Sequence, residues 1–135
     1  MSYKIDDIEG VGPAFLAKLT AAGISNTRDL LNACCTKRGR AEMAEETGIS
    51  EKLLLSWSNM ADLMRIKGVG KQYAELLEAA GVDTVKELRN RKPENLTTKM
   101  KEVNAQKRLT RATPSATQVT AWVRQAKTLK PAISY

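Results

Sequence analysis

The fold is decided by the segment IKGVGK at residues 66–71. Two glycines separated by one valine predict a tight turn, and the residues that follow have the apolar spacing of a helix. The first N–H groups of a helix have no partner inside it, so a turn of this kind offers hydrogen-bond donors to an anion such as phosphate. The same pattern occurs earlier in the chain, as IEGVGP at residues 8–13.

The two segments belong to an internal repeat. Residues 8–31 align with residues 66–89 at an offset of 58, with nine identical pairs in 24 positions. The identical pairs are Ile8 and Ile66, Gly10 and Gly68, Val11 and Val69, Gly12 and Gly70, Leu19 and Leu77, Ala21-Ala22-Gly23 and Ala79-Ala80-Gly81, and Leu30 and Leu88.

The repeat continues with a changed offset further along the chain. Ser115, Trp122 and Ala126 align with Ser50, Trp57 and Ala61 at an offset of 65. The difference of seven residues predicts an insertion in the second copy, within Arg89–Pro114. We therefore expect two tandem units, residues 1–64 and residues 65–135, of which the second carries the insertion.

Helical periodicity accounts for nearly the whole chain and strand alternation for almost none of it, so we expect an all-α fold. The first predicted helix begins at Pro13 and ends at Gly23, and longer helices are predicted over 38–47, 50–65 and, in the insertion, 93–106. Two shorter helices are predicted as well, one capped by Asn26 or Thr27 and the other by a capping box of Thr84 and Glu87. The helix over 50–65 has an apolar stripe formed by Leu53, Leu54, Trp57, Met60, Ala61 and Met64. The place of Trp57 within that stripe indicates a core residue.

The charge of the chain is unevenly distributed. Residues 1–64 carry seven Lys and Arg against nine Asp and Glu, a balance of −2, whereas residues 65–135 carry fifteen against six, a balance of +9. A basic half favours a polyanionic partner such as nucleic acid, although a basic helical surface also serves solubility alone. Without an apolar run of membrane-spanning length or a signal-peptide pattern, we expect a soluble cytoplasmic protein.

Metal-dependent and enzymatic functions are disfavoured by the residue types present. Histidine is absent, and Cys34 and Cys35 are adjacent, which suits neither a disulfide nor a common zinc pattern. We expect two reduced cysteines that pack between helices, and no metal or cofactor. Asp83 lies 13 residues after Gly70 and is interpreted as a turn residue before the Thr84 cap rather than a catalytic group, so a non-enzymatic role is expected.

These motifs resemble a known fold. The pattern Ile-x-Gly-Val-Gly, a helix of about ten residues, Ala-Gly-(Ile/Val) and a capped short helix reaching leucine is similar to the helix-hairpin-helix of DNA repair and recombination proteins. The whole chain resembles the paired helix-hairpin-helix proteins of the domain of unknown function 4332 family. The resemblance implies two tandem helix-hairpin-helix units in a SAM-like helical bundle, and sequence-independent contact between hairpin amides and DNA phosphates.

The residues predicted to bind nucleic acid are those of the second hairpin and of the basic region that follows it. They are Lys67, Gly68, Val69, Gly70, Lys71, Arg89, Arg91, Lys92, Lys107, Arg108 and Arg111. The first hairpin, Gly10-Val11-Gly12, is a weaker candidate because Glu9 repels phosphate and Pro13 has no N–H.

Two other interpretations of the same residues stay open. The Gly-Val-Gly turns are also suited to a purely structural role, in which Val11 and Val69 are buried beneath the turn. The acidic first half and basic second half would also suit a protein-interaction or scaffold module that associates with a partner or with itself.

Overall fold

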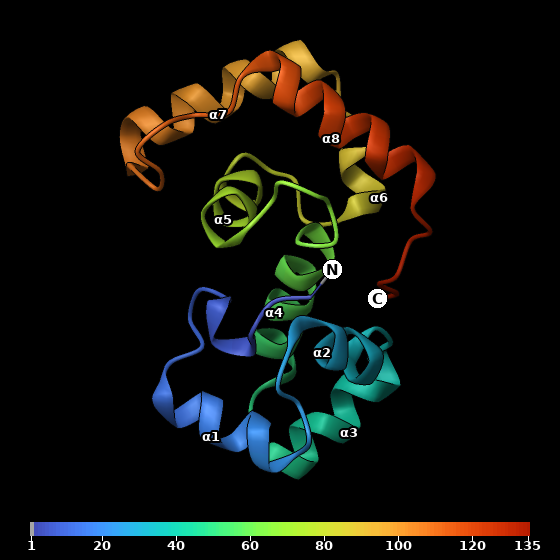
Figure 1. Ribbon diagram of the computed structural model, residues 1–135. Coiled ribbons are helices and arrows are strands. Elements are labelled where there is room, and N and C mark those ends of the chain that lie inside the picture. Colours follow the sequence, from blue (N-terminus) through green and yellow to red (C-terminus); the bar gives the residue numbers. More distant parts are fainter. Residues whose placement is uncertain (1) are drawn as a thin grey trace.

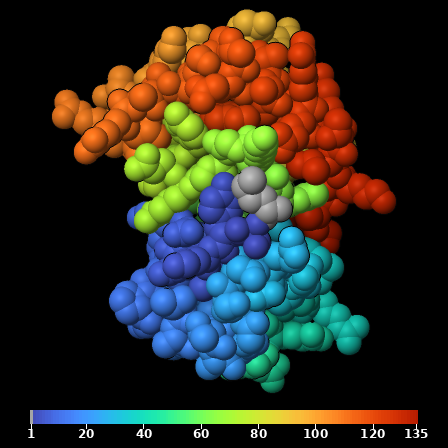
Figure 2. Space-filling model, in the orientation of Figure 1, coloured from blue at the N-terminus to red at the C-terminus, as the bar shows by residue number. Residues whose placement is uncertain are grey.

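The computed structural model describes residues 2–135, and over that range the chain is all-helical, which confirms the predicted fold class. Figure 1 shows two lobes joined through one central helix, and Figure 2 shows the two lobes packed against each other. The elements are the 3-10 helix η1 (Ile5–Asp7) and the helices α1 (Pro13–Ala21), α2 (Thr27–Cys34), α3 (Lys37–Thr47), α4 (Glu51–Leu63), α5 (Lys71–Ala79), α6 (Val85–Leu88), α7 (Pro93–Lys107) and α8 (Ala116–Thr128). We refer to residues 2–64, with η1–α4, as the first unit and to residues 65–135, with the second glycine turn, α5–α8 and the tail (129–135), as the second.

Three of the four helix pairs begin at the offsets found in the sequence, α1 with α5 and α2 with α6 at 58 and α4 with α8 at 65, whereas α3 and α7 begin 56 residues apart. Helices α1 and α5 each have nine residues, and α4 and α8 each have thirteen. Gly12 and Gly70 are the N-caps of the first pair, and Ser50 and Ser115 cap the second pair through their side chains. The same local signals therefore start the corresponding helices in both copies.

Between α6 and α8 the second unit differs from the first in the lengths of its helices and loops, and α6 has four residues against eight in α2. Helix α7 has 15 residues against 11 in α3. Residues 108–115 connect α7 to α8, whereas only residues 48–50 connect α3 to α4. Leu96, Met100 and Val103 form the buried face of α7, as the sequence predicts.

Each glycine turn packs on a tryptophan of its own unit. Gly10 and Gly68 have φ angles of +95° and +93°, a region that residues with a side chain seldom adopt. A Cβ added to Gly10 would lie 3.2 Å from Nε1 of Trp57, and one added to Gly68 would lie 3.2 Å from Nε1 of Trp122. Backbone conformation and close packing therefore both require glycine at these two positions.

The tryptophans are in turn fixed by aromatic neighbours. Phe15 of α1 packs on Trp57 with ring centroids 5.1 Å apart, and Tyr73 of α5 packs on Trp122 at 5.2 Å. Trp57 is only 2% exposed, which confirms it as a core residue. Val11 and Val69 are buried as well, as a structural role of the two turns requires.

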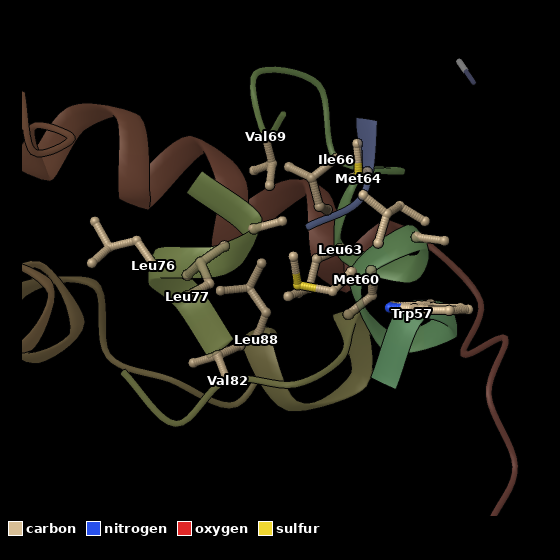
Figure 3. Close-up of a cluster of buried hydrophobic side chains, with 14 of the residues drawn as sticks. Trp57, Met60, Leu63, Met64, Ile66, Val69, Leu76, Leu77, Val82 and Leu88 are labelled. Atoms are coloured by element: carbon tan, nitrogen blue, oxygen red, sulfur yellow. The ribbon is translucent and has the colours of Figure 1, made fainter. Parts of the chain in front are cut away.

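The central helix α4 joins the cores of the two units. It packs against α2 and α3 on one side and against α5 on the other. Figure 3 shows side chains of α4 among buried residues of the second unit; the labelled ones are Trp57, Met60, Leu63 and Met64 from α4 and its C-terminal end, with Ile66, Val69, Leu76, Leu77, Val82 and Leu88. The hydrophobic core is thus continuous from one unit to the other.

A buried carboxylate at the end of α4 strengthens this junction. Asp62 is 1% exposed, and its Oδ2 accepts a hydrogen bond of 2.8 Å from the N–H of Val85, the first residue of α6. Its Oδ1 accepts from Nη1 of Arg65 at 2.7 Å. A carboxylate at a helix N-terminus is favourable, and the arginine offsets the cost of burying it.

The tail returns from the second unit to the first. Nη2 of Arg65 donates to the carbonyl of Lys130 at 2.9 Å, and the N–H of Ser134 donates to the carbonyl of Cys35 at 2.8 Å. Arg40, which is 4% exposed, donates from Nη2 to the carbonyl of Ser134 at 2.7 Å. The tail that follows α8 is consequently bonded to Arg65 after α4, to Cys35 after α2 and to Arg40 in α3.

One predicted cap differs in detail from the structure. The Thr84 hydroxyl oxygen accepts from the N–H of Glu87 at 3.3 Å, but the Glu87 carboxylate accepts from the N–H of Asp83 rather than from that of Thr84. The predicted reciprocal capping box at Thr84 is therefore wrong in its second half. Such a reciprocal box occurs instead at Ser115 and Gln118, where α8 begins.

The contact between glycine and indole predicts that a glycine-to-alanine substitution lowers the free energy of unfolding more at Gly68 than at Gly23. Gly23 has a φ of +87° with no atom within 4 Å of an added Cβ, so Gly23→Ala should cost about 1 kcal/mol for its backbone conformation alone. Gly68→Ala has the same backbone penalty and also crowds Trp122. We therefore expect the free energy of unfolding, measured in urea, to fall by about 1 kcal/mol more in Gly68→Ala than in Gly23→Ala. Equal losses for the two variants would mean that the indole contact contributes nothing.

Candidate nucleic-acid interface

The second hairpin presents a helix start with unpaired donors. The N–H of Val69 donates to the carbonyl of Ile66 at 3.1 Å, which closes the turn, and Gly70 then caps α5 without a side-chain hydrogen bond. Within residues 2–135, the N–H groups of Lys71, Gln72 and Tyr73 have no hydrogen-bond acceptor. These amides and the positive end of the α5 dipole are the features that bind an anion at a helix start.

The first hairpin has the same backbone and fewer donors. The N–H of Val11 donates to the carbonyl of Ile8 at 3.2 Å, and Gly12 caps α1 as Gly70 caps α5. Pro13 occupies the first position of α1, where it has no N–H to offer. The second hairpin is therefore the better equipped of the two for binding an anion.

The structure places the two hairpins beside each other, with a direct contact between their charged side chains. Nζ of Lys71 lies 3.3 Å from Oε2 of Glu9, and both side chains are about half exposed. Tyr3 also reaches the second hairpin, since its Cε1 lies 4.0 Å from the position of a Cβ on Gly70. An acidic residue of the first hairpin thus contacts the predicted phosphate-binding lysine of the second.

The charge of Glu9 also acts on the first turns of α5. Partial burial, and next the charge of Glu9, raise the pKa of Glu75, while Lys71 opposes this rise. An exposed ion pair such as Glu9 with Lys71 is worth less than about 1 kcal/mol, so Lys71 can exchange one anionic partner for another. The local field at the second hairpin is nevertheless less positive than its own sequence indicates.

Lys67 is the better available cation of the hairpin. Its N–H donates to Oε1 of Gln125 in α8 at 2.8 Å, which fixes the backbone just before the turn. Its side chain is exposed and has no carboxylate within ion-pair distance among residues 2–135. Lys67 can therefore meet a phosphate without first releasing another partner.

The predicted residues between α6 and α7 lie away from the hairpin. Arg91 binds the C-terminal end of α5, where Nη2 lies 3.4 Å from the carbonyl oxygen of Ala80 and Nη1 lies 3.4 Å from that of Gly81. It also pairs with Glu87 at 3.7 Å. Lys71 begins α5, and nine residues of helix span about 13 Å, so Arg89, Arg91 and Lys92 are near the opposite end of that helix.

The remaining predicted residues form a third group at the far end of α7. Lys107 and Arg108 end that helix, with Arg108 in the left-handed conformation at φ +51°, and Arg111 lies in the following loop. Asn104 fixes this loop through two hydrogen bonds to Thr110, at 3.0 Å and 2.9 Å. In Figure 1 the loop projects beyond α5, and the 15 residues of α7 place it about 22 Å from Lys92.

The predicted site residues thus fall into three groups. The hairpin group, 67–71, has two exposed lysines beside three unpaired amides, whereas the helix start at Lys92 has Pro93, which lacks an N–H, and the acidic Glu94. Sequence reasoning missed the contact of Glu9 with Lys71 and the role of Gln125 in positioning Lys67. Neither contact has a local sequence signal, because each joins residues far apart in the chain.

No group of histidine, cysteine or carboxylate side chains suited to a metal ion occurs within residues 2–135. Cys34 and Cys35 are both free thiols, as expected, and Cys34 is fully buried in the core. Burial raises the pKa of Cys34 to about 11, against the opposing charge of Arg40. No helix in the same range is long and apolar enough to cross a membrane.

Fold and site together define an all-helical protein of two similar units, in which corresponding glycine turns pack on corresponding tryptophans. The chain belongs to the family described as Domain of unknown function (DUF4332), which it matches over residues 9–129. That match includes both glycine turns and all eight α-helices from α1 to α8 among the described residues. No match was found among curated proteins or among solved structures.

The two cysteines should differ in reactivity. With a pKa of about 11, the Cys34 thiol is ionised to about one part in a thousand at pH 8, and burial also blocks access. We expect iodoacetamide at pH 8 to modify one thiol rapidly and the second only after unfolding in guanidinium, as measured by mass spectrometry. Cys35→Ser should abolish the rapid reaction, and two thiols reacting at similar rates in the folded protein would contradict the placement of Cys34.

Proposed function

We propose that this protein binds DNA without sequence specificity, through phosphate contacts at the second hairpin. The observation that carries the proposal is the start of α5, where unpaired backbone amides lie beside the exposed lysines 67 and 71. Amides and lysines at a helix start hold phosphate oxygens but do not read bases. The balance of +9 over residues 65–135 supports the same partner, because it attracts a polyanion over a longer range.

The hairpin group is favoured over the other basic groups for a geometric reason. Arg91 is engaged with Glu87 and with carbonyls at the end of α5, so it stabilises the fold whether or not DNA binds. Lys107, Arg108 and Arg111 are exposed, and in the proposal they supply secondary contacts with a longer stretch of backbone. Affinity then depends first on the hairpin and second on the end of α7.

The role proposed is non-enzymatic, requires no cofactor, and belongs in the cytoplasm. A protein-interaction module is the alternative from a different class. Among residues 2–135 the exposed large hydrophobic side chains are Leu53 and Tyr135, which lie on α4 and in the tail. Two separate side chains do not form the apolar patch that usually marks a protein interface, and this favours DNA.

Binding to a random DNA duplex at increasing salt tests the proposal. We expect log K to fall linearly with log salt, since each neutralised phosphate contributes a slope of about −0.9. The double variant Lys67→Ala, Lys71→Ala should weaken binding and reduce the slope by roughly two units. The matched control is Lys37→Ala, Lys52→Ala, which removes the same charge from exposed positions of the first unit. Absence of binding at low salt, or an equal effect of both pairs, would contradict the proposal.

The contact of Glu9 with Lys71 predicts a substitution that strengthens DNA binding instead of weakening it. Glu9→Gln removes both the competing partner of Lys71 and a negative charge beside the phosphate site, so DNA affinity should rise several-fold at low salt. Glu45→Gln, an exposed carboxylate in α3, is the control for the change in net charge. Equal gains in the two variants would show that overall charge, and not the hairpin, determines the affinity.

A further inference from the structure

A cavity of about 520 Å³ lies between helix α2 and the tail, at the junction of the two units. Its lining residues are Thr27, Arg28, Leu31, Asn32, Cys35, Arg65, Leu129 and Ala132. None of these residues belongs to the hairpins or to the predicted DNA-binding groups. The volume is in the range of small-molecule sites, about 300–1,000 Å³.

One wall of the cavity is a single face of α2. Arg28, Leu31, Asn32 and Cys35 follow the spacing i, i+3, i+4 and i+7, which places them on one side of a helix. The opposite side of α2 is buried in the core. The apolar side of α2 packs against α4, and this packing turns the other side of α2 toward the cavity.

The other wall is the tail, which is held at both ends. Arg65 is bonded to Asp62 at 2.7 Å and to the carbonyl of Lys130 at 2.9 Å, so the same guanidinium lines the cavity and anchors its far wall. Ser134 is bonded to the carbonyl of Cys35 and to Arg40. The tail is thus held at one end by Arg65, after α4, and at the other by Cys35, after α2, so the cavity is preorganised for a ligand.

The chemistry of the lining favours an anion with an apolar part. Arg28 has neither an ion pair nor a side-chain hydrogen bond among residues 2–135, and no lining residue is acidic. Arg65 uses one hydrogen bond from each terminal nitrogen and keeps further donors. Leu31, Leu129 and Ala132 supply apolar surface to the same cavity.

We propose that this cavity binds a small organic anion, a carboxylate or phosphate ester with an apolar body. The anionic group pairs with Arg28, and Arg65 adds donors from the tail side. The apolar body lies against Leu31, Leu129 and Ala132. Guanidinium groups suit both carboxylate and phosphate, because their planar donors bind two oxygens at once.

Four probes separate the contributions of charge and apolar body. We would titrate the full chain with phenyl phosphate, benzoate, inorganic phosphate and benzyl alcohol, and follow backbone amide shifts by NMR. Phenyl phosphate or benzoate should shift amides in residues 27–35 and 129–132, with at least fivefold tighter binding than inorganic phosphate or benzyl alcohol. The stronger of the two anions identifies phosphate or carboxylate as the preferred group. Absence of shifts in residues 27–35 and 129–132, or equal affinities of all four probes at these residues, would overturn the proposal.

Charge reversal and cavity filling provide the matching variants. Arg28→Glu should weaken binding of the preferred anion at least tenfold, whereas Arg124→Glu, the same change at an exposed position of α8, should change it less than twofold. Ala132→Trp should block binding by filling the cavity, with urea unfolding used to check that the variant is folded. Equal weakening by both arginine variants would overturn the assignment. Because the cavity shares no residue with the hairpin, this result does not depend on whether DNA binds.

Discussion

The contact between a left-handed glycine and a tryptophan indole is the constraint on which each unit depends. Gly10 with Trp57, and Gly68 with Trp122, join the beginning of a unit to its last helix. The turn can pass so close to the ring only because glycine has no side chain there. The turn then directs the chain into α1 or α5, whose Phe15 or Tyr73 packs on the same ring. Turn, aromatic pair and final helix thus form one interdependent arrangement, present twice.

This constraint separates what the repeat preserves from what it changes. Both copies keep the glycines, the buried valine and the tryptophan, and all of these serve packing. The copies differ in the exposed residues beside the turn, where Glu9 and Pro13 in one correspond to Lys67 and Lys71 in the other. Because Glu9 lies against Lys71, the divergent charges of the two copies also meet in space. One hairpin has therefore become part of the electrostatic environment of the other.

The sequence was sufficient to predict the helices and most of the core. Periodicity located the buried faces of α4 and α7, because it is encoded by residues close together in the chain, although Leu53 of the predicted α4 stripe is exposed. The sequence was much less informative about the site. Glu9 beside Lys71, Arg91 on the carbonyls of α5 and Arg65 on the tail all result from how distant helices pack. Composition marked the second half as basic but did not indicate which cations the fold itself uses.

The tail makes the order of synthesis relevant to the first unit. Arg40 and Ser134 are 94 residues apart in the chain, yet the carbonyl of Ser134 is one of the two acceptors of the buried Arg40 guanidinium. At about 5–20 residues per second, a ribosome needs roughly 5–20 seconds to add the intervening residues. During that interval the first unit lacks an acceptor for a cation that is costly to bury without one. The first unit to leave the ribosome is therefore the last to acquire all of its hydrogen bonds.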